Sequence, residues 1–271
     1  MGFAGQAVWI TGASSGIGAA FARELAKDGA RLILSGRKLA ALEEVAKDAG
    51  DALVLPFEVT DHAAIPALAA QAWDWADGID MLVNNAGISQ RSLAVDTDFP
   101  VYERIVAVDL LAPIALTQAI LPRMVARGSG RLAMISSVAG MAGSPLRSAY
   151  SAAKFGLRGY AGSVRAETGH LGIQVHVIAP GSIRTDVSRN ALTADGSARG
   201  RSDKAIDNGM DPGVAVRQML DAMLAGKREI VIAEGIERWL AEQSRTPDEV
   251  FDYFAEMMAK GYAAKLGVGD Q

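Results

Sequence analysis

Short apolar runs alternate along this chain with segments in which apolar residues recur at helical spacing. The runs are four to seven residues long and occupy residues 7–10, 31–35, 52–57, 79–83, 130–136, 174–179 and 229–232. Strands that are apolar throughout are typical of parallel sheets that are covered on both faces. The pattern therefore predicts an α/β fold with a doubly wound, seven-stranded parallel sheet and helices on both faces.

The chain of 271 residues is long enough to bury one substantial core, and we expect one domain with its core at residues 7–233. Residues 182–210 interrupt the alternation with a polar stretch of no lasting period, which predicts a substrate loop or lid. Residues 234–271 read as a C-terminal helical extension. In it, residues 246–249 (TPDE) form the sequence of a capping box, and the expected apolar face consists of Val250, Phe254, Met257 and Met258.

Composition excludes several classes of function. The chain has no cysteine, and its three histidines (His62, His170 and His176) lack ligand spacing, so we expect no metal site. A net charge of −4 disfavours nucleic acid as a partner. The first strand begins within a few residues of the N-terminus, and we find no uninterrupted apolar run of about 18 residues. We therefore expect a cytoplasmic protein without a membrane segment.

A glycine-containing loop follows the first predicted strand directly. Residues 11–18 read TGASSGIG, and a segment of helical spacing begins at once. Backbone N–H groups of such a loop, together with the N-terminus of the helix, can hold a pyrophosphate. The glycines Gly12, Gly16 and Gly18 are spaced G-x-x-x-G-x-G, and many ordinary turns look similar. Taken alone, the loop is only a weak indication of nucleotide binding.

The end of the second strand indicates which dinucleotide would bind. An acidic residue there would bond the ribose 2′-OH of NAD, whereas an arginine accommodates the 2′-phosphate of NADP. This chain has no acid at that point and carries Arg37, which favours NADP(H). The alternative is that Arg37 is simply the solvated start of the next helix.

Three polar residues are spaced so that they can meet. Tyr150 and Lys154 are four residues apart and would share one face of a helix, while Ser137 ends the fifth strand. Asp109 is a single carboxylate on the apolar stripe of a long helix predicted over residues 100–127. It is either an ordinary ion-paired helix residue or a buried acid that faces the active centre.

These motifs together resemble the short-chain dehydrogenase/reductase family. The resemblance rests on residues 11–18, Asn84-Asn85-Ala86-Gly87, Ser137, Tyr150-x-x-x-Lys154 and Pro180-Gly181, in the family's order and spacing. It extends from Ala7 to about Ile232 and implies a Rossmann-like fold. The segments 84–89 and 190–196 are also similar to the dehydrogenase/reductase member 7 branch of that family.

The resemblance implies a role for each matching residue. Tyr150 would be the general acid/base, Lys154 would bind the nicotinamide ribose and lower the tyrosine pKa, and Ser137 would hold the substrate carbonyl. The implied cofactor contacts, together with Arg37, are Gly12, Ser14, Ser15, Gly16, Ile17, Gly18, Glu58, Val59, Asn85, Ala86, Tyr150, Lys154, Ile183 and Thr185.

Two positions depart from the family's usual residues. Glu58 stands where aspartate is more frequent, and Asp109 stands where many members have an asparagine in a water relay from Lys154 to solvent. The charge of Asp109 could pair with Lys154 and weaken its effect on the tyrosine. Alternatively, the aspartate could still anchor a water through its backbone or side chain, so this departure concerns the relay and not the hydride chemistry.

The sequence thus predicts an NADP(H)-dependent oxidoreductase that acts on a ketone or secondary alcohol. Candidate pocket residues Met141, Pro145, Leu146 and Val187 indicate an uncharged, mostly apolar substrate. The alternative is a regulatory protein that binds NADP with little or no turnover. A homodimer or homotetramer is implied by the family, and the small residues of the helix predicted at residues 148–171 are compatible with it.

Overall fold

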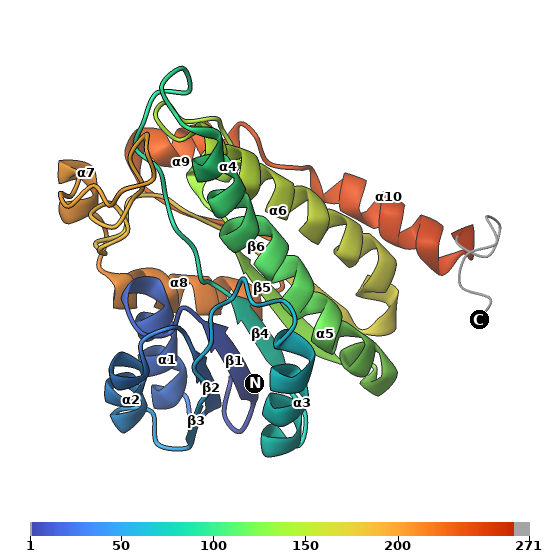
Figure 1. Ribbon diagram of the computed structural model, residues 1–271. Helices are drawn as coiled ribbons and strands as arrows, with labels where there is room; N and C mark the ends of the chain where they lie inside the picture. The colour runs from blue at the N-terminus through green and yellow to red at the C-terminus, as the bar shows by residue number, and fades with distance from the viewer. Residues whose placement is uncertain (1, 263–271) are drawn as a thin grey trace.

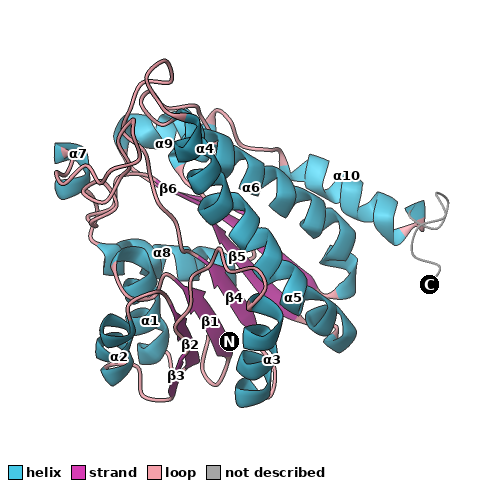
Figure 2. Cartoon of the chain, viewed as in Figure 1, coloured by secondary structure: helices cyan, strands magenta, loops and turns pink. Residues whose placement is uncertain are grey.

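The structure is a computed structural model that describes residues 2–262. Its centre is one parallel sheet with the strand order β3-β2-β1-β4-β5-β6-β7 (Figures 1 and 2). The strands are β1 Ala7–Thr11, β2 Arg31–Ser35, β3 Ala52–Val54, β4 Met81–Asn84, β5 Gly130–Ile135, β6 Ile173–Pro180 and β7 Glu229–Ile232. The predicted doubly wound, Rossmann-like sheet is confirmed. The last residues of the predicted C-terminal extension, 263–271, lie outside the described part.

Helices cover both faces of the sheet (Figure 1). One face packs against α1 (Gly16–Lys27), α2 (Leu39–Lys47) and α8 (Pro212–Leu224), and the other against α3 (Ile65–Ala76), α5 (Ala112–Arg127) and α6 (Ser148–Thr168). Neighbouring strand residues point to opposite cores, since Trp9 joins the second group and Ile10 the first. The remaining short elements are α4 Phe99–Val106, η1 Ala107–Leu111, η2 Val138–Gly140, η3 Gly169–Leu171, α7 Lys204–Asp207, α9 Gly235–Glu242 and α10 Asp248–Ala259.

Two elements differ from the sequence-based expectation. The third strand ends at Val54 instead of Phe57, although the Leu55 and Phe57 N–H groups still donate to the carbonyls of Leu34 and Gly36. The long helix predicted at residues 100–127 is continuous but contains the π-helical turn η1, which carries Asp109. Pro113 lacks the N–H that an α-helix would donate to the Asp109 carbonyl, and this favours the local rewinding.

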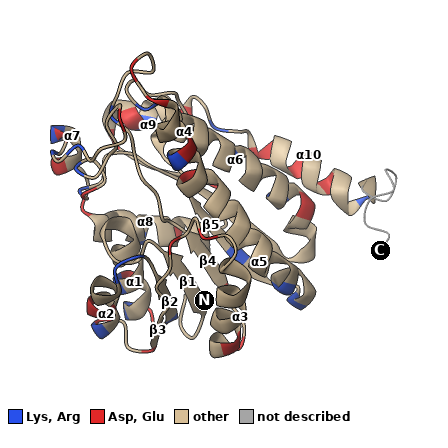
Figure 3. Ribbon diagram, in the orientation of Figure 1, with Lys and Arg blue, Asp and Glu red and all other residues tan. Residues whose placement is uncertain are grey.

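Charged residues of both signs are interspersed along the helices and loops, whereas the central strands β1 and β4 contain none (Figure 3). The predicted lid at residues 182–210 is folded against the domain. Asp203 accepts hydrogen bonds from Arg91 (2.7 Å) and Arg199 (2.5 Å), and Leu192 pairs with the backbone around Gln90. The lid is therefore fixed to the segment that follows β4.

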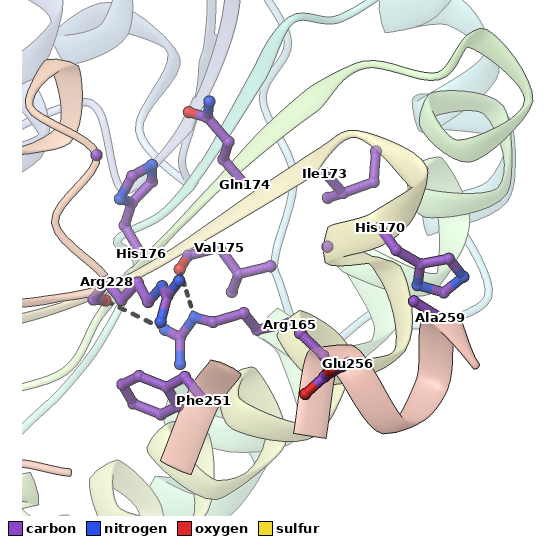
Figure 4. Close-up of a pocket in the computed structure, with 13 residues that line it drawn as sticks. Arg165, His170, Ile173, Gln174, Val175, His176, Arg228, Phe251, Glu256 and Ala259 are labelled. Carbon is purple, nitrogen blue, oxygen red and sulfur yellow. Dashed lines mark hydrogen bonds between the residues drawn. The ribbon is translucent and has the colours of Figure 1, made fainter. Parts of the chain in front are cut away.

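The C-terminal extension is held by arginines of α6. Arg158 pairs with the buried Glu229 at 2.6 Å and donates to the hydroxyl of Thr246 at 3.0 Å. The Thr246 hydroxyl thus bonds Arg158 and not the backbone of α10. The expected capping box does not form, since no side chain caps α10. Figure 4 shows Arg165 beside Phe251, whose ring centroid lies 4.4 Å from the guanidinium carbon. Phe251 supplies the packing expected of Val250 and Phe254, which are both exposed.

One helix among the described residues could span a membrane by length and composition alone. It is the continuous helix of residues 99–127, with a mean hydropathy of 1.9 and 39% of its apolar window buried. Our expectation that no segment qualifies overlooked this helix, because Asp109 and Pro113 interrupt its apolar run. In this fold Leu116 and Ile120 are fully buried against the sheet, as in the core helix of a globular domain. The cytoplasmic location remains a prediction.

Candidate active site

The carboxyl ends of the strands border a cavity of about 710 Å³. This is where a doubly wound sheet opens between its two sets of helices. Most of the predicted site residues line it, from the glycine loop, four strand ends, α6 and the lid: Gly12, Ser14, Ser15, Gly16, Ile17, Arg37, Glu58, Val59, Asn85, Ala86, Ser137, Tyr150, Lys154, Ile183 and Thr185. The fold therefore brings the predicted catalytic and cofactor residues into one space.

The glycine loop has the shape of an anion cradle. Gly12 and Gly16 have positive φ angles of 65° and 54°, which favour glycine. The N-terminus of α1 opens onto the cavity, and the side chain of its N-cap residue, Ser15, makes no capping hydrogen bond. Free N–H groups at a helix N-terminus, with the hydroxyls of Ser14 and Ser15, suit a pyrophosphate. These residues fit a dinucleotide.

Gly18 is a predicted cofactor residue that does not line the cavity. A Cβ atom at this position would collide with the carbonyl oxygen of Gly12 and lie 2.6 Å from Nδ2 of Asn85. Asn85 donates from Nδ2 to the Thr11 carbonyl at 2.9 Å, and the Thr11 hydroxyl accepts from the Asn85 N–H at 3.0 Å. Gly18 thus allows the glycine loop and the end of β4 to approach each other closely.

The hydroxyl hydrogens of Ser137 and Tyr150 have no close hydrogen-bond acceptor among the described residues. The Ser137 hydroxyl accepts from the Ala139 N–H at 3.1 Å, and the acceptor nearest to its own hydrogen is the Pro180 carbonyl at 3.5 Å. Within residues 2–262 the phenol oxygen of Tyr150 makes no hydrogen bond. Both groups are free to bond an oxygen atom placed in the cavity.

Lys154 and Asp109 form a buried ion pair behind Tyr150. Nζ of Lys154 lies 3.2 Å from Oδ2 of Asp109, and the side chains are 4% and 0% exposed. Lys154 also donates to the Ile135 carbonyl at 2.9 Å, and Oδ1 of Asp109 accepts from the Ile88 N–H at 2.8 Å. The ammonium lies 5.7 Å from the Tyr150 ring centroid. The two alternatives for Asp109 are thus both partly right: it is ion-paired, and it is buried behind the active centre.

Burial and charge act against each other in this pair. Burial raises the pKa of Asp109, although the Lys154 charge and the Ile88 N–H oppose this. Burial alone would lower the pKa of Lys154, but the negative charge of Asp109, the neighbouring Tyr150 and the short contact with Asp109 together outweigh it and raise the pKa above its usual value. Lys154 therefore remains an ammonium near neutral pH. Oδ2 of Asp109 makes no well-formed hydrogen bond with the described residues, so one acceptor position is unused.

Arg37 and Glu58 face each other at the other end of the cavity. Nη1 of Arg37 lies 3.6 Å from Oε2 of Glu58, and their side chains are 62% and 44% exposed. Such an exposed pair is weak and exchanges readily with a ligand. Lys38 also lines the cavity beside Arg37, so two cations and one carboxylate surround this end.

The substrate side of the cavity differs from the sequence-based expectation. Of the four candidate pocket residues only Val187 lines the cavity; Met141 is buried elsewhere, and Leu146 is 45% exposed. The apolar wall comes instead from residues of the lid and of the segment after β4: Ile88, Val187, Leu192, Ala198 and Ile206. The paths of these loops are set by contacts distant in sequence, and local spacing could not reveal them.

A second cavity of about 460 Å³ lies between the start of β6 and α10 (Figure 4). It contains none of the predicted site residues. His176 lines it, and because a carbonyl can only accept, Nδ1 of His176 donates to the Lys227 carbonyl at 2.7 Å. Burial lowers the pKa of His176 to about 4, so the ring is neutral. Within residues 2–262 no group of histidine and acidic residues could hold a metal ion.

Comparison with known proteins agrees with the geometry. Residues 6–196 match the family profile described as short chain dehydrogenase. The chain is 39% identical over 238 residues to dehydrogenase/reductase SDR family member 7B of Danio rerio, covering 84% of this chain and 77% of that protein. It is 35% identical over 236 residues to family member 7 of Homo sapiens, covering 84% and 70%. The resemblance to the member 7 branch is confirmed.

Solved structures show the same architecture. A short-chain dehydrogenase from Streptomyces avermitilis superimposes with a TM-score of 0.79 at 27% identity, covering 96% of this chain and 97% of that one. An SDR protein from Burkholderia phymatum, solved with NAD, has the same TM-score at 19% identity, which shows the fold alone.

Removal of Asp109 should destabilise the fold, because it leaves the Lys154 ammonium buried and unpaired. We expect Asp109→Ala to lower the free energy of unfolding by about 3–5 kcal/mol in chemical denaturation. The double variant Asp109→Leu/Lys154→Met should recover most of this loss. Glu44→Ala, which removes only the exposed Lys47–Glu44 pair, is the matched control and should change stability by less than about 1 kcal/mol. Equal losses in the two single variants would contradict this interpretation of the buried pair.

Proposed function

Because the chain belongs to the short-chain dehydrogenase/reductase family, we propose that it transfers hydride between NADP(H) and a ketone or secondary alcohol. The observation that carries the proposal is the convergence of Ser137, Tyr150 and Lys154 on the cavity that the glycine loop also lines. The bound nicotinamide would supply or accept the hydride. The chain's own residues would bind the oxygen atom of the substrate and move its proton.

In carbonyl reduction the substrate oxygen gains negative charge as the hydride arrives. The Ser137 hydroxyl donates a hydrogen bond to this oxygen, since its hydrogen has only the distant Pro180 carbonyl as an alternative. Tyr150 gives the oxygen its phenolic proton as general acid, and takes that proton back in alcohol oxidation.

Lys154 supports both directions of proton transfer. Its positive charge, 5.7 Å from the Tyr150 ring centroid, stabilises the phenolate that remains after the proton leaves. One of its N–H groups is fixed by Ile135, another faces Asp109, and the remaining one is available to a ribose hydroxyl in the cavity. Asp109 reduces the net charge at the site, so this stabilisation is weaker than that of an unpaired ammonium.

The substrate is proposed to be uncharged and mostly apolar. Leu192, Ile206 and Val187 of the lid form an apolar wall, and the segment after β4 adds Ile88. Burial of apolar surface against these side chains would supply the binding energy.

The direct test is NADPH consumption with a panel of apolar ketones. We expect Tyr150→Phe to lower kcat by at least about 100-fold, because the variant lacks the transferable proton. Tyr160→Phe, on the same helix but outside the cavity, should keep wild-type activity. Equal turnover by wild type and Tyr150→Phe would refute the proposal. Binding of NADPH without turnover of any substrate would favour the regulatory alternative instead.

Cofactor preference is proposed to depend on Arg37. Arg37 and Lys38 would attract a 2′-phosphate, and no acid ends β2 to bond the 2′-OH of NAD. Glu58 opposes this preference, because its carboxylate pairs with Arg37 and would repel the phosphate.

Two substitutions should move the preference in opposite directions. Arg37→Asp should shift the ratio of kcat/KM for NADPH over NADH by at least about tenfold toward NADH, the size expected of a charged hydrogen bond. Glu58→Gln should shift it toward NADPH. Arg23→Asp reverses a charge on α1 away from the cavity and should leave the ratio unchanged. If Arg37→Asp has no more effect than Arg23→Asp, the assignment of Arg37 fails.

We also propose assembly into a homodimer or homotetramer. On α6, Phe155 is exposed, and a Cβ atom at Gly159 or Gly162 would meet nothing within 4 Å. These three residues share one helix face, at i, i+4 and i+7. This face leaves room for the close approach of a helix from another copy.

A further inference from the structure

The helix that carries Tyr150 begins only two residues before it. Helix α6 begins at Ser148, and the side chain of its N-cap residue Arg147 makes no capping hydrogen bond. Tyr150 is the third residue of the helix, so its position depends on how well the first turn is held. An uncapped first turn frays readily.

Gln90, in the segment after β4, supplies the missing cap. Its side-chain oxygen Oε1 accepts from the Ala149 N–H at 2.9 Å, immediately before Tyr150. Its amide nitrogen Nε2 donates to the hydroxyls of Ser92 (3.0 Å) and Thr97 (3.1 Å), and a longer bond reaches Ser148 (3.4 Å). Gln90 is 0% exposed, so water does not compete with these bonds.

The backbone at Gln90 is held as firmly as its side chain. The Leu192 N–H donates to the Ser89 carbonyl and the Arg91 N–H donates to the Leu192 carbonyl, both at 2.8 Å. Leu192 lines the cavity from the lid. One residue therefore joins the start of the tyrosine helix to the wall against which a substrate would lie.

We propose that Gln90 is a positioning residue for Tyr150. It acts as an N-cap supplied by a distant segment, and it sets the first turn of α6 against the lid residue Leu192. The inference rests on the proposed function for its kinetic consequence, whereas the cap itself does not depend on it. Gln90 touches no reacting atom, so its effect should fall on kcat and not on dinucleotide binding.

The test compares Gln90→Met with the matched variant Thr97→Val. Methionine keeps the approximate shape of glutamine but cannot accept from the Ala149 N–H. Valine removes a hydroxyl from the same cluster without touching α6. We expect Gln90→Met to lower kcat about 10- to 100-fold, as a small misplacement of a reacting group does. NADPH affinity should stay within about twofold, since Gln90 does not line the cavity. Thr97→Val should keep wild-type kcat.

Amide hydrogen exchange provides a readout that needs no substrate. The N–H groups of residues 149–151 should exchange faster in Gln90→Met and at the wild-type rate in Thr97→Val. Gln90→Asn, whose amide is one methylene too short to reach α6, gives the same comparison if methionine prevents folding.

The outcomes separate the two proposals. If Tyr150→Phe turns over like wild type, the proposed function fails, and exchange at residues 149–151 still decides whether Gln90 caps the helix. Unchanged exchange in Gln90→Met overturns the cap. Faster exchange with wild-type kcat, in an enzyme that Tyr150→Phe inactivates, overturns the positioning role. Equal loss of kcat in Gln90→Met and Thr97→Val would show a merely structural effect and overturns it as well.

Discussion

The active centre depends on one buried ion pair, between Lys154 of α6 and Asp109 of η1. Neither charge could remain in the interior alone, because the cost of removing an ion from water far exceeds that of a lost hydrogen bond. Gly87 makes the arrangement tight: a Cβ atom there would lie 3.2 Å from Oδ2 of Asp109 and 3.5 Å from Nζ of Lys154. The pair thus ties α6, the long helix and the end of β4 together directly behind Tyr150.

The segment after β4 connects the buried ion pair to the other parts of the site through hydrogen bonds. Asn85 is bonded to Thr11 below the glycine loop, the Ile88 N–H holds Asp109, and Gln90 holds the first turn of α6 and the lid. Residues 85–90 therefore position the glycine loop, the Lys154 ammonium, the Tyr150 phenol and the apolar wall of the cavity. Loops are usually the more variable part of a fold. The hydrogen bonds of this one explain how it can hold reacting groups in fixed relative positions.

Much of this arrangement was predictable from the chain because its signals are local. Apolar runs indicated the strands, and the four-residue spacing of Tyr150 and Lys154 placed both on one helix face. Asp109 was recognisable as a charge on an apolar stripe, and the family resemblance already indicated Lys154 as a possible partner; the crossing of the two helices brings them together. Gln90 gave no signal, since its partner Ala149 is 59 positions away. Leu146 and Met141 were misplaced for the same reason: the paths of loops are set by distant contacts, which periodicity does not report.

Lys154 stays an ammonium because the charges around it, that of Asp109 first, compensate its burial. ¹⁵N NMR of side-chain-labelled lysine, assigned with Lys154→Arg, measures this directly in the intact protein. We expect an ammonium resonance for Lys154 that does not titrate below the usual lysine pKa of 10.5, since Asp109 and Tyr150 together outweigh burial and raise the Lys154 pKa above that value. In Asp109→Asn the resonance should titrate at lower pH, because burial is then unopposed. A Lys154 resonance that titrates near neutral pH in the wild-type protein would show that Asp109 does not compensate the burial of Lys154.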